Sequence, residues 1–354
     1  MPTFCRHNRF LERCPICSKT LPGHAPGGRQ TAAGRGASKA AGAGTRSRSR
    51  REGVQVRKEL RAHDDGYRSE LAPGLRASAD AARLAREIAF ASGRLAALAA
   101  EPPGLYSEVR ALAAEDPERA TWACFLIAYL CPLEGEDPFA GIRLALAVGP
   151  EHGAPSGEEG LRVLRALDLQ GIPLGPRTSH DPARGAEVLL SYLQWVQRGG
   201  TPAAQSATAA DVVGATQAQA FIGDPGWSPQ RRFERVFERL ALPGFGRMGR
   251  YDLLVTLGRL GVYELSPDSL HLGGARGQSA EDPTQQAAKR VFAIADALLL
   301  ERRASALAEA ARVPVEALDL ALGNWASAQR ATLGFPAEAE DAGALASAES
   351  ALGI

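Results

Sequence analysis

The sequence predicts an all-α fold, and three observations support the prediction. Hydrophobic residues make up 45% of the 354 residues but aromatic residues only 6%, so alanine and leucine supply most of the apolar side chains. Both are strong helix formers, and runs of β-branched residues, which favour strands, are scarce. Apolar residues also recur at helical spacing between prolines and glycines that mark segment ends. A chain of this length can form one or two domains with a sizeable core.

The first 24 residues predict a small structural zinc knuckle. Three of the five cysteines lie here, in the string CRHNRFLERCPIC. A tetrahedral site with three thiolates and one imidazole suits zinc. A disulfide or a redox Cys-x-x-Cys pair is the alternative, and His24 is an alternative fourth ligand. The expected ligands are Cys5, His7, Cys14 and Cys17.

Residues 25–75 are expected to form a disordered basic linker. The segment is rich in Gly, Ala, Ser and Arg and lacks apolar periodicity. Residues 25–62 carry ten basic and two acidic side chains, and residues 1–24 carry four and one. Because the net charge of the whole chain is +1, the remaining body carries about −10. A nucleic-acid role therefore requires this linker or a local basic face to supply the positive charge. The alternative is that the linker only keeps the protein soluble.

Residues 76–223 predict the first layer of helices. Residues 76–98 and 183–197 show helical periodicity, and further helices are expected at 138–146, 158–167 and within 203–221. Residues 121–131 are apolar on every side, which indicates a central buried helix ended by Pro132. Cys124 and Cys131 lie in this segment and are expected to pack in the core. The acidic turn that contains Glu134 follows and is a candidate pocket rim, although a solvated turn is the alternative.

Residues 229–260 predict two helices joined by a tight hairpin. Ser228 and Pro229 are typical of the start of a helix, which should extend to about Ala241. The glycines of Pro243-Gly244-Phe245-Gly246 allow a sharp turn and a close approach of a ligand to the backbone. The next helix extends to Leu260, and its first amides suit a phosphate oxygen. Beyond it, a long helix is expected at 282–303 and a last one at 314–329.

The hairpin carries a resemblance to known proteins. LPGFGRMGRYDLL resembles the hairpin of the helix-hairpin-helix DNA glycosylase superfamily, and residues 121–146 resemble the buried helix that opens its catalytic domain. FCRHNRFLERCPIC, LPGFGRMGRYDLL and DPTQQAAKRVF together are similar to the alpha-glutamyl/putrescinyl thymine pyrophosphorylase family, clade 3. The resemblance covers about residues 80–330 and the knuckle. It implies a two-layer, helix-hairpin-helix DNA glycosylase-like fold with a small zinc knuckle, and DNA with hypermodified pyrimidines as the partner.

The resemblance also suggests site residues. In the superfamily an aspartate about twenty residues beyond the hairpin lies at the mouth of the base pocket, and Asp268 lies 21 residues after Arg247. Asp268 and Asp252 are therefore the candidate catalytic carboxylates. Helix capping by Asp268 and an ion pair of Asp252 are the alternatives. Some members carry a Schiff-base lysine where this chain has Met248, so lyase chemistry is not expected.

Residues 231–303 carry twelve basic and nine acidic side chains, so this part of the body is locally positive. Tyr251 or Trp227 is a candidate for stacking on a base, with core packing as the alternative for Tyr251. The expected DNA-contacting residues are Gly244, Phe245, Gly246, Arg247, Arg250 and Lys289.

These observations predict a protein that binds DNA and processes modified pyrimidines, by base excision or by modification of the base substituent. A non-catalytic DNA-binding module and a helical protein-interaction scaffold are the rival hypotheses. The predicted division is a knuckle at 1–24, a linker at 25–75, a helical domain at 76–334 and a flexible acidic tail at 335–354. No apolar run reaches the roughly 18 residues of a membrane span. With no apolar signal core at the N-terminus, a cytoplasmic location is expected.

Overall fold

The structure is a computed structural model that describes residues 62–147, 165, 169, 172–200, 216–273 and 282–354. Over these ranges the chain forms helices, with two isolated β-bridges and no strand, which confirms the predicted all-α class. The predicted zinc knuckle, its four expected ligands and most of the expected basic linker lie outside the described residues. The helices are α1 (Ser78–Ala99), α2 (Leu105–Glu115), α3 (Pro117–Leu130), α4 (Ala140–Ala147), α6 (Glu187–Gln197), α7 (Gln217–Ile222), α8 (Pro229–Arg239), α9 (Arg247–Arg259), α10 (Pro283–Phe292), α11 (Ala297–Ala310), α12 (Ala317–Ala326) and α13 (Ala342–Leu352).

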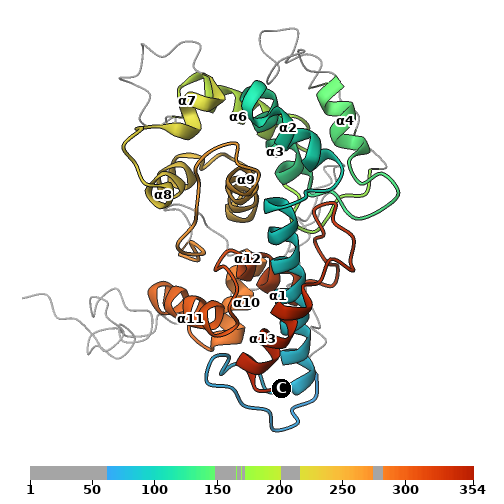
Figure 1. Ribbon diagram of the computed structural model, residues 1–354, viewed down its shortest axis with the longest axis vertical. Helices are drawn as coiled ribbons and strands as arrows, with labels where there is room; N and C mark the ends of the chain where they lie inside the picture. Colours follow the sequence, from blue (N-terminus) through green and yellow to red (C-terminus); the bar gives the residue numbers. More distant parts are fainter. Residues whose placement is uncertain (1–61, 148–164, 166–168, 170–171, 201–215, 274–281) are drawn as a thin grey trace, which may run out of the picture. The chain divides into compact units, whose positions relative to one another are not determined.

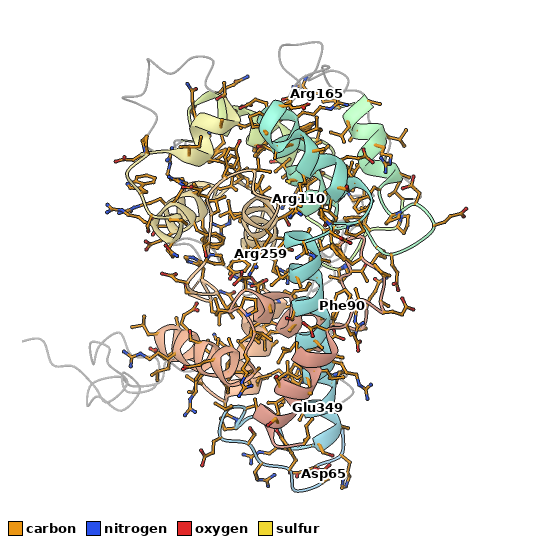
Figure 2. The ribbon with its side chains drawn as sticks, in the orientation of Figure 1. Asp65, Phe90, Arg110, Arg165, Arg259 and Glu349 are labelled. Carbon is orange, nitrogen blue, oxygen red and sulfur yellow. The ribbon has the colours of Figure 1, made fainter. Side chains whose placement is uncertain are left out.

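The helices pack in two groups that α1 connects (Figure 1). The first group is built on α3, which contacts α2, α4, α7 and α9, while α8 contacts α7 and α9. The second group consists of α10, α11, α12 and α13. α1 packs along α12 and α13 and also contacts α9. Arg110 of α2 donates to the carbonyl of Arg259 at 3.3 Å, which holds α2 against the end of α9 (Figure 2).

The centre of the first group is the buried helix that the sequence predicts. Every residue from Ala120 to Leu130 is buried, as expected for a segment that is apolar on all sides. Asp116 caps the helix by accepting a hydrogen bond from the Arg119 amide at 3.0 Å. Phe125 stacks on Tyr192 of α6 with ring centroids 3.7 Å apart. Cys124 and Cys131 are both buried and free of disulfides, which confirms their core positions.

Three predicted boundaries differ from the structure. The helix expected at 282–303 is two helices, because Ala293 adopts a left-handed φ of 53° and Asp296 caps a new helix. The linker does not extend to residue 75, since Ala72 and Leu75 are buried in the core. The C-terminal segment is not a flexible tail: α13 packs on α1 through the buried side chains of Ala344, Ala348 and Leu352.

The predicted helix at 158–167 and most of that at 203–221 lie outside the described residues. α2 and α13 were not predicted from the sequence. No helix in the described ranges is long and apolar enough to span a membrane.

Gly93 allows the C-terminal segment to cross α1. A Cβ atom at this position would lie 2.1 Å from the carbonyl oxygen of Ala339, closer than any real contact. Alanine favours a helix over glycine by about 1 kcal/mol, so any loss of stability must come from this contact. We expect Gly93→Ala to lower the free energy of unfolding by about 1–3 kcal/mol in urea denaturation.

Gly135 provides the control for this prediction, because a Cβ atom there would meet no atom within 4 Å. Gly135→Ala should change the free energy of unfolding by less than about 0.5 kcal/mol. An unchanged or increased stability of Gly93→Ala would contradict the proposed packing.

Candidate functional site

The hairpin between α8 and α9 is a tight turn with an exposed tip. The amide of Phe245 donates to the carbonyl of Leu242 at 3.1 Å, and Gly244 has a φ of 79° between them. Proline followed by a glycine of positive φ is typical of a type II turn. The Phe245 side chain is buried against Phe125 with centroids 5.2 Å apart, so the Phe245 ring anchors the turn and does not face solvent. The exposed residues of the turn are Pro243, Gly244 and Gly246.

The start of α9 presents backbone to solvent. Gly246 is its N-cap, and no side chain caps the first amides. The φ of Gly246 is −70°, which any residue adopts, and a Cβ atom there would meet no atom within 4 Å. The fold therefore does not require glycine at this position. Arg184 lies beside the turn, because its Nη1 atom is 3.3 Å from where a Cβ atom of Gly244 would stand.

Helix α8 brings the chain into the hairpin as predicted. Ser228 caps it by accepting a hydrogen bond from the Arg231 amide at 3.2 Å, and Pro229 is its first residue. Arg231 and Arg235 are exposed, but Arg232 is buried and donates to the carbonyls of Ile222 and Glu264 at 3.0 Å.

Arg250 braces the hairpin from inside. The side chain is fully buried, and its Nη1 atom donates to the carbonyl of Phe237 at 2.9 Å while Nε donates to Gly246 at 3.4 Å. The guanidinium also lies over the Phe237 ring, 4.4 Å from its centroid. Burial, reinforced by the nearby charge of Arg247, lowers the pKa of Arg250 to about 10. The structure therefore places Arg250 inside the protein, where it joins the end of α8 to the cap of α9.

Arg247, expected to contact DNA, and Asp252, a candidate catalytic carboxylate with an ion pair as the alternative, are members of a buried chain of ion pairs. Arg247 donates to Asp319 of α12 and to Asp282 at the cap of α10, both at 2.5 Å. Arg177 donates to the two oxygens of Asp252 at 2.8 and 3.0 Å and also to Asp319. These residues connect the hairpin helix α9 to α10 and α12 of the second group.

The charges in this set of ion pairs determine the protonation states of its members. Burial works to raise the pKa of Asp319, but Arg247 and Arg177 outweigh it, and the pKa lies below its usual value. Burial raises the pKa of Asp252, and Arg177 only partly opposes the effect. Both oxygens of Asp252 already accept from Arg177, so this carboxylate is committed to a structural ion pair.

The segment after α9 is fixed at several points and presents Asp268 to solvent. Tyr251 donates to the carbonyl of Ser269 at 3.0 Å, and Arg247 donates to the carbonyl of Leu270 at 2.8 Å. Glu301 of α11 accepts the amide of Leu270 at 2.8 Å and that of Leu272. Asp268 lies just before these anchors and is exposed. An exposed carboxylate on a backbone held by α9 and α11 is a preorganised arrangement for chemistry.

His271 lies in the same segment in a strained conformation. Its φ is 53°, which is uncommon for a residue with a Cβ atom, and its ring stacks on Phe237 at 4.3 Å. Nε2 of His271 is buried and has no hydrogen-bond partner among the described residues. Burial lowers the pKa of His271 to about 4, Asp268 opposes this, and Arg247 and Arg250 reinforce it. The imidazole is therefore neutral near pH 7 and fastens the Asp268 segment to the end of α8.

The remaining predicted site residues lie in other places. Tyr251 is 1% exposed and serves the core. Trp227 is half-buried in the turn before α8, and Glu134 accepts the amide of Ala337 at 2.6 Å, which links two loops. Lys289 lies in the last turn of α10, about two turns beyond Asp282. The structure thus ties the segment that follows Asp268 to the start of α9, while Lys289 lies on α10.

Three residues of this region were not found from the sequence. Asp319 is surrounded in sequence by Leu318, Leu320 and Leu322, and a carboxylate within an apolar helix signals a buried charge partner. Arg177 and Glu301 carry no such local signal, because their partners are distant in sequence. No group of three or more His, Cys, Asp or Glu in the described ranges is arranged to bind a metal ion. The zinc site at Cys5, His7, Cys14 and Cys17 stays a prediction.

Residues 177–333 match the family model described as alpha-glutamyl/putrescinyl thymine pyrophosphorylase clade 3. The match confirms the resemblance over this range, which begins at Arg177 and includes the hairpin, Asp268 and the whole ion-pair chain. No curated protein matches the chain. No solved structure matches it.

The buried neutral state of His271 predicts an acid-dependent loss of stability. A lowered pKa means that the unfolded state binds the proton first. The contribution of His271 is therefore fully present above the unfolded pKa of about 6.5 and is lost as pH falls toward about 4. This loss amounts to roughly 3 kcal/mol. We expect His271→Phe, which keeps the stack on Phe237, to flatten the dependence of unfolding free energy on pH in this window.

His63 is exposed and provides the matched control. His63→Phe should leave the pH profile of unfolding unchanged. If His271→Phe and the wild type lose the same stability between pH 6.5 and 4, the neutral buried imidazole is ruled out.

Proposed function

We propose that this protein binds DNA through the α8–α9 hairpin and acts on a modified thymine, with Asp268 as the reacting carboxylate. The observation that carries the proposal is the exposed hairpin backbone with Asp268 on an anchored segment beside it, both inside the range that matches the thymine pyrophosphorylase family. The rival hypothesis is a module that binds DNA without catalysis.

The geometry of the hairpin supports contact through its backbone. Gly244 and Gly246 are exposed, and the first amides of α9 have no capping side chain. Amides at a helix N-terminus attract phosphate oxygens through hydrogen bonds and the helix dipole. Arg184 lies beside the turn and adds a half-exposed positive charge, although Asp181 pairs with it at 3.5 Å. Arg247 and Arg250 support the hairpin from inside and need not touch the phosphate.

Asp268 is tied to the same hairpin. Arg247, the first residue of α9, holds the carbonyl of Leu270, and His271 stacks on Phe237 near the end of α8. A base flipped out of DNA that is held at the hairpin would thus lie within reach of Asp268. Asp252 is a weaker candidate than Asp268, because its two oxygens already pair with Arg177.

The family description indicates the class of reaction. A pyrophosphorylase moves a group between pyrophosphate and an acceptor, and glutamate and putrescine are amines. In the proposed reaction an amine displaces pyrophosphate from the thymine substituent, or the reverse occurs. An amine that forms a new bond to carbon must lose a proton, and Asp268 is placed to accept it. Excision of the base is the alternative outcome, and the same assay separates the two by product mass.

A negative charge at Gly246 should disrupt the phosphate contact without disturbing the fold. The position is open to solvent and its backbone accepts any residue, so Gly246→Glu should fold normally. We expect its affinity for duplex DNA to fall at least about tenfold, or 1.4 kcal/mol, in fluorescence anisotropy titrations. Gly135→Glu places the same charge in an equally open turn and should bind as the wild type does. Equal affinities of the two variants would remove the hairpin from the interface.

Asp268→Asn tests the catalytic assignment. We expect the variant to bind DNA with the affinity of the wild type and to lose product formation by about 100-fold or more, the usual effect of a general base. The measurement is the mass of nucleosides from DNA with pyrophosphorylated or amine-bearing thymine substituents after incubation with protein. Asp296→Asn, a substitution of another exposed aspartate, is the control. Full activity of Asp268→Asn would exclude this carboxylate, and binding without product in the wild type would favour the rival module.

A further inference from the structure

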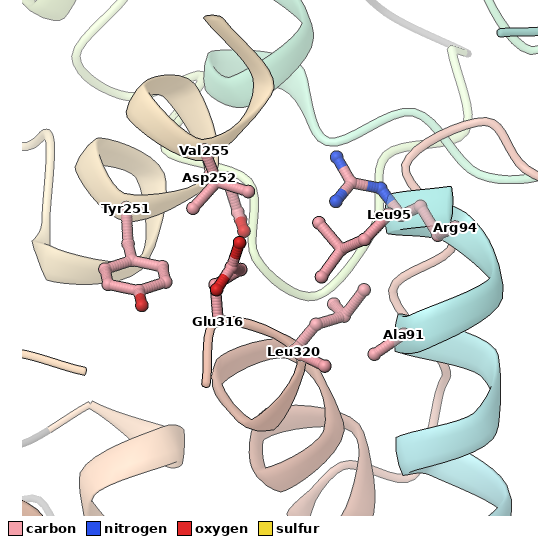
Figure 3. A pocket seen from close by; sticks show the side chains of 9 residues that line it. Ala91, Arg94, Leu95, Tyr251, Asp252, Val255, Glu316 and Leu320 are labelled. Atoms are coloured by element: carbon pink, nitrogen blue, oxygen red, sulfur yellow. The ribbon is translucent and has the colours of Figure 1, made fainter. Parts of the chain in front are cut away.

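A small cavity lies between the two groups of helices, at the middle of α9. Figure 3 shows the side chains of Arg94 from α1, Asp252 from α9 and Glu316 before α12 turned toward it. The space amounts to about 230 Å³ including its mouth, and its closed part has room for about one water molecule. A second, open cavity of about 260 Å³ shares Val255 and Glu316 with the first and is also lined by Ser266 and Pro267, next to Asp268.

Arg94 is a buried cation without a carboxylate partner. The side chain is 3% exposed, and no carboxylate in the described ranges lies within ion-pair distance of it. Nη2 of Arg94 donates to Thr256 at 3.2 Å and the guanidinium also interacts with the Tyr106 hydroxyl, but its buried Nε–H has no acceptor among the described residues. An unpaired charge removed from water costs several kcal/mol. Among the other buried arginines, Arg177 and Arg247 have carboxylate partners, whereas Arg250 also has none in the described ranges.

The two carboxylates that line the cavity already have arginine partners. Asp252 is paired with Arg177, and Glu316 accepts from Arg259. Neither carboxylate lies within ion-pair distance of Arg94. Arg94 therefore keeps a buried Nε–H without an acceptor among the described residues, beside a space that adjoins a larger cavity. A planar guanidinium with open donors is the arrangement that proteins use to bind carboxylates and phosphates.

We propose that Arg94 anchors a subsite for an anionic oxygen, belonging to a phosphate, a pyrophosphate or a carboxylate. One oxygen of the anion occupies the closed space at Nε of Arg94, and the rest of the ligand lies toward the larger cavity. The subsite differs from the hairpin in its residues and its location. It stands even if the protein does not process DNA.

The test compares the wild type with Arg94→Met and Arg86→Met. Methionine replaces the apolar stem of Arg94 but removes the guanidinium, which lies over the Phe335 ring. Arg86 lies on the same helix and is exposed, so Arg86→Met removes a surface charge only. Each protein is titrated with inorganic phosphate, pyrophosphate or acetate at constant ionic strength. Binding is measured by isothermal titration calorimetry and by the shift in Tm.

We expect saturable binding of at least one anion by the wild type and by Arg86→Met, and at least tenfold weaker binding by Arg94→Met. Without anion, Arg94→Met should be as stable as the wild type or more stable, because an unpaired buried charge has been removed. Binding of phosphate or pyrophosphate alone identifies a phosphoryl ligand, and binding of acetate alone identifies a carboxylate. Either no saturable binding by the wild type or undiminished binding by Arg94→Met would overturn the proposal.

Discussion

The shared carboxylate of Asp319 is the interaction on which the rest of this structure depends. It accepts from Arg177 and Arg247, and these two arginines in turn hold Asp252 and Asp282. Removing one member of such a buried set leaves an uncompensated charge, which typically costs 3–5 kcal/mol. Because Asp319 is on α12, Asp282 caps α10 and Asp252 is on α9, the set fixes the hairpin helix against the second group. Close packing alone would specify this placement less strictly, since apolar contacts have no preferred direction.

This arrangement changes how the hairpin can bind DNA. Arg247 and Arg250 look like phosphate ligands in the sequence, yet both are buried, and their donors serve Asp282, Asp319 and backbone carbonyls. What remains at the surface is the backbone of the turn, with the exposed glycines Gly244 and Gly246. Backbone amides bind phosphates without regard to base sequence. In the proposed function, recognition of a particular base is then left to the segment around Asp268.

The sequence predicted the features that depend on residues close together in the chain. The helical class, the buried α3, the Ser228 cap and the hairpin all follow from spacing, capping residues and glycines close together in the chain. It did not predict which arginines are buried, because the partners of Arg247 lie 35 and 72 residues away. The break at Ala293 was missed for a related reason, since alanine is a strong helix former and Asp296 caps the next helix inside an otherwise helical pattern. Asp268 was found by its distance from the hairpin, but its anchors on Tyr251 and Glu301 were not.

The buried arginines beside α9 separate into two kinds, and the difference has a functional meaning. Arg177 and Arg247 are paired with aspartates, whereas Arg94 and Arg250 have no carboxylate partner among the described residues. A fold that needed only stability would replace Arg94 by an apolar side chain, because the unpaired charge opposes folding. Retaining the charge is reasonable if an anion compensates it during function, since functional sites often carry such a cost in stability. α9 then has two proposed roles. Its first turn would contact the DNA backbone, and its middle lines the cavity beside Arg94.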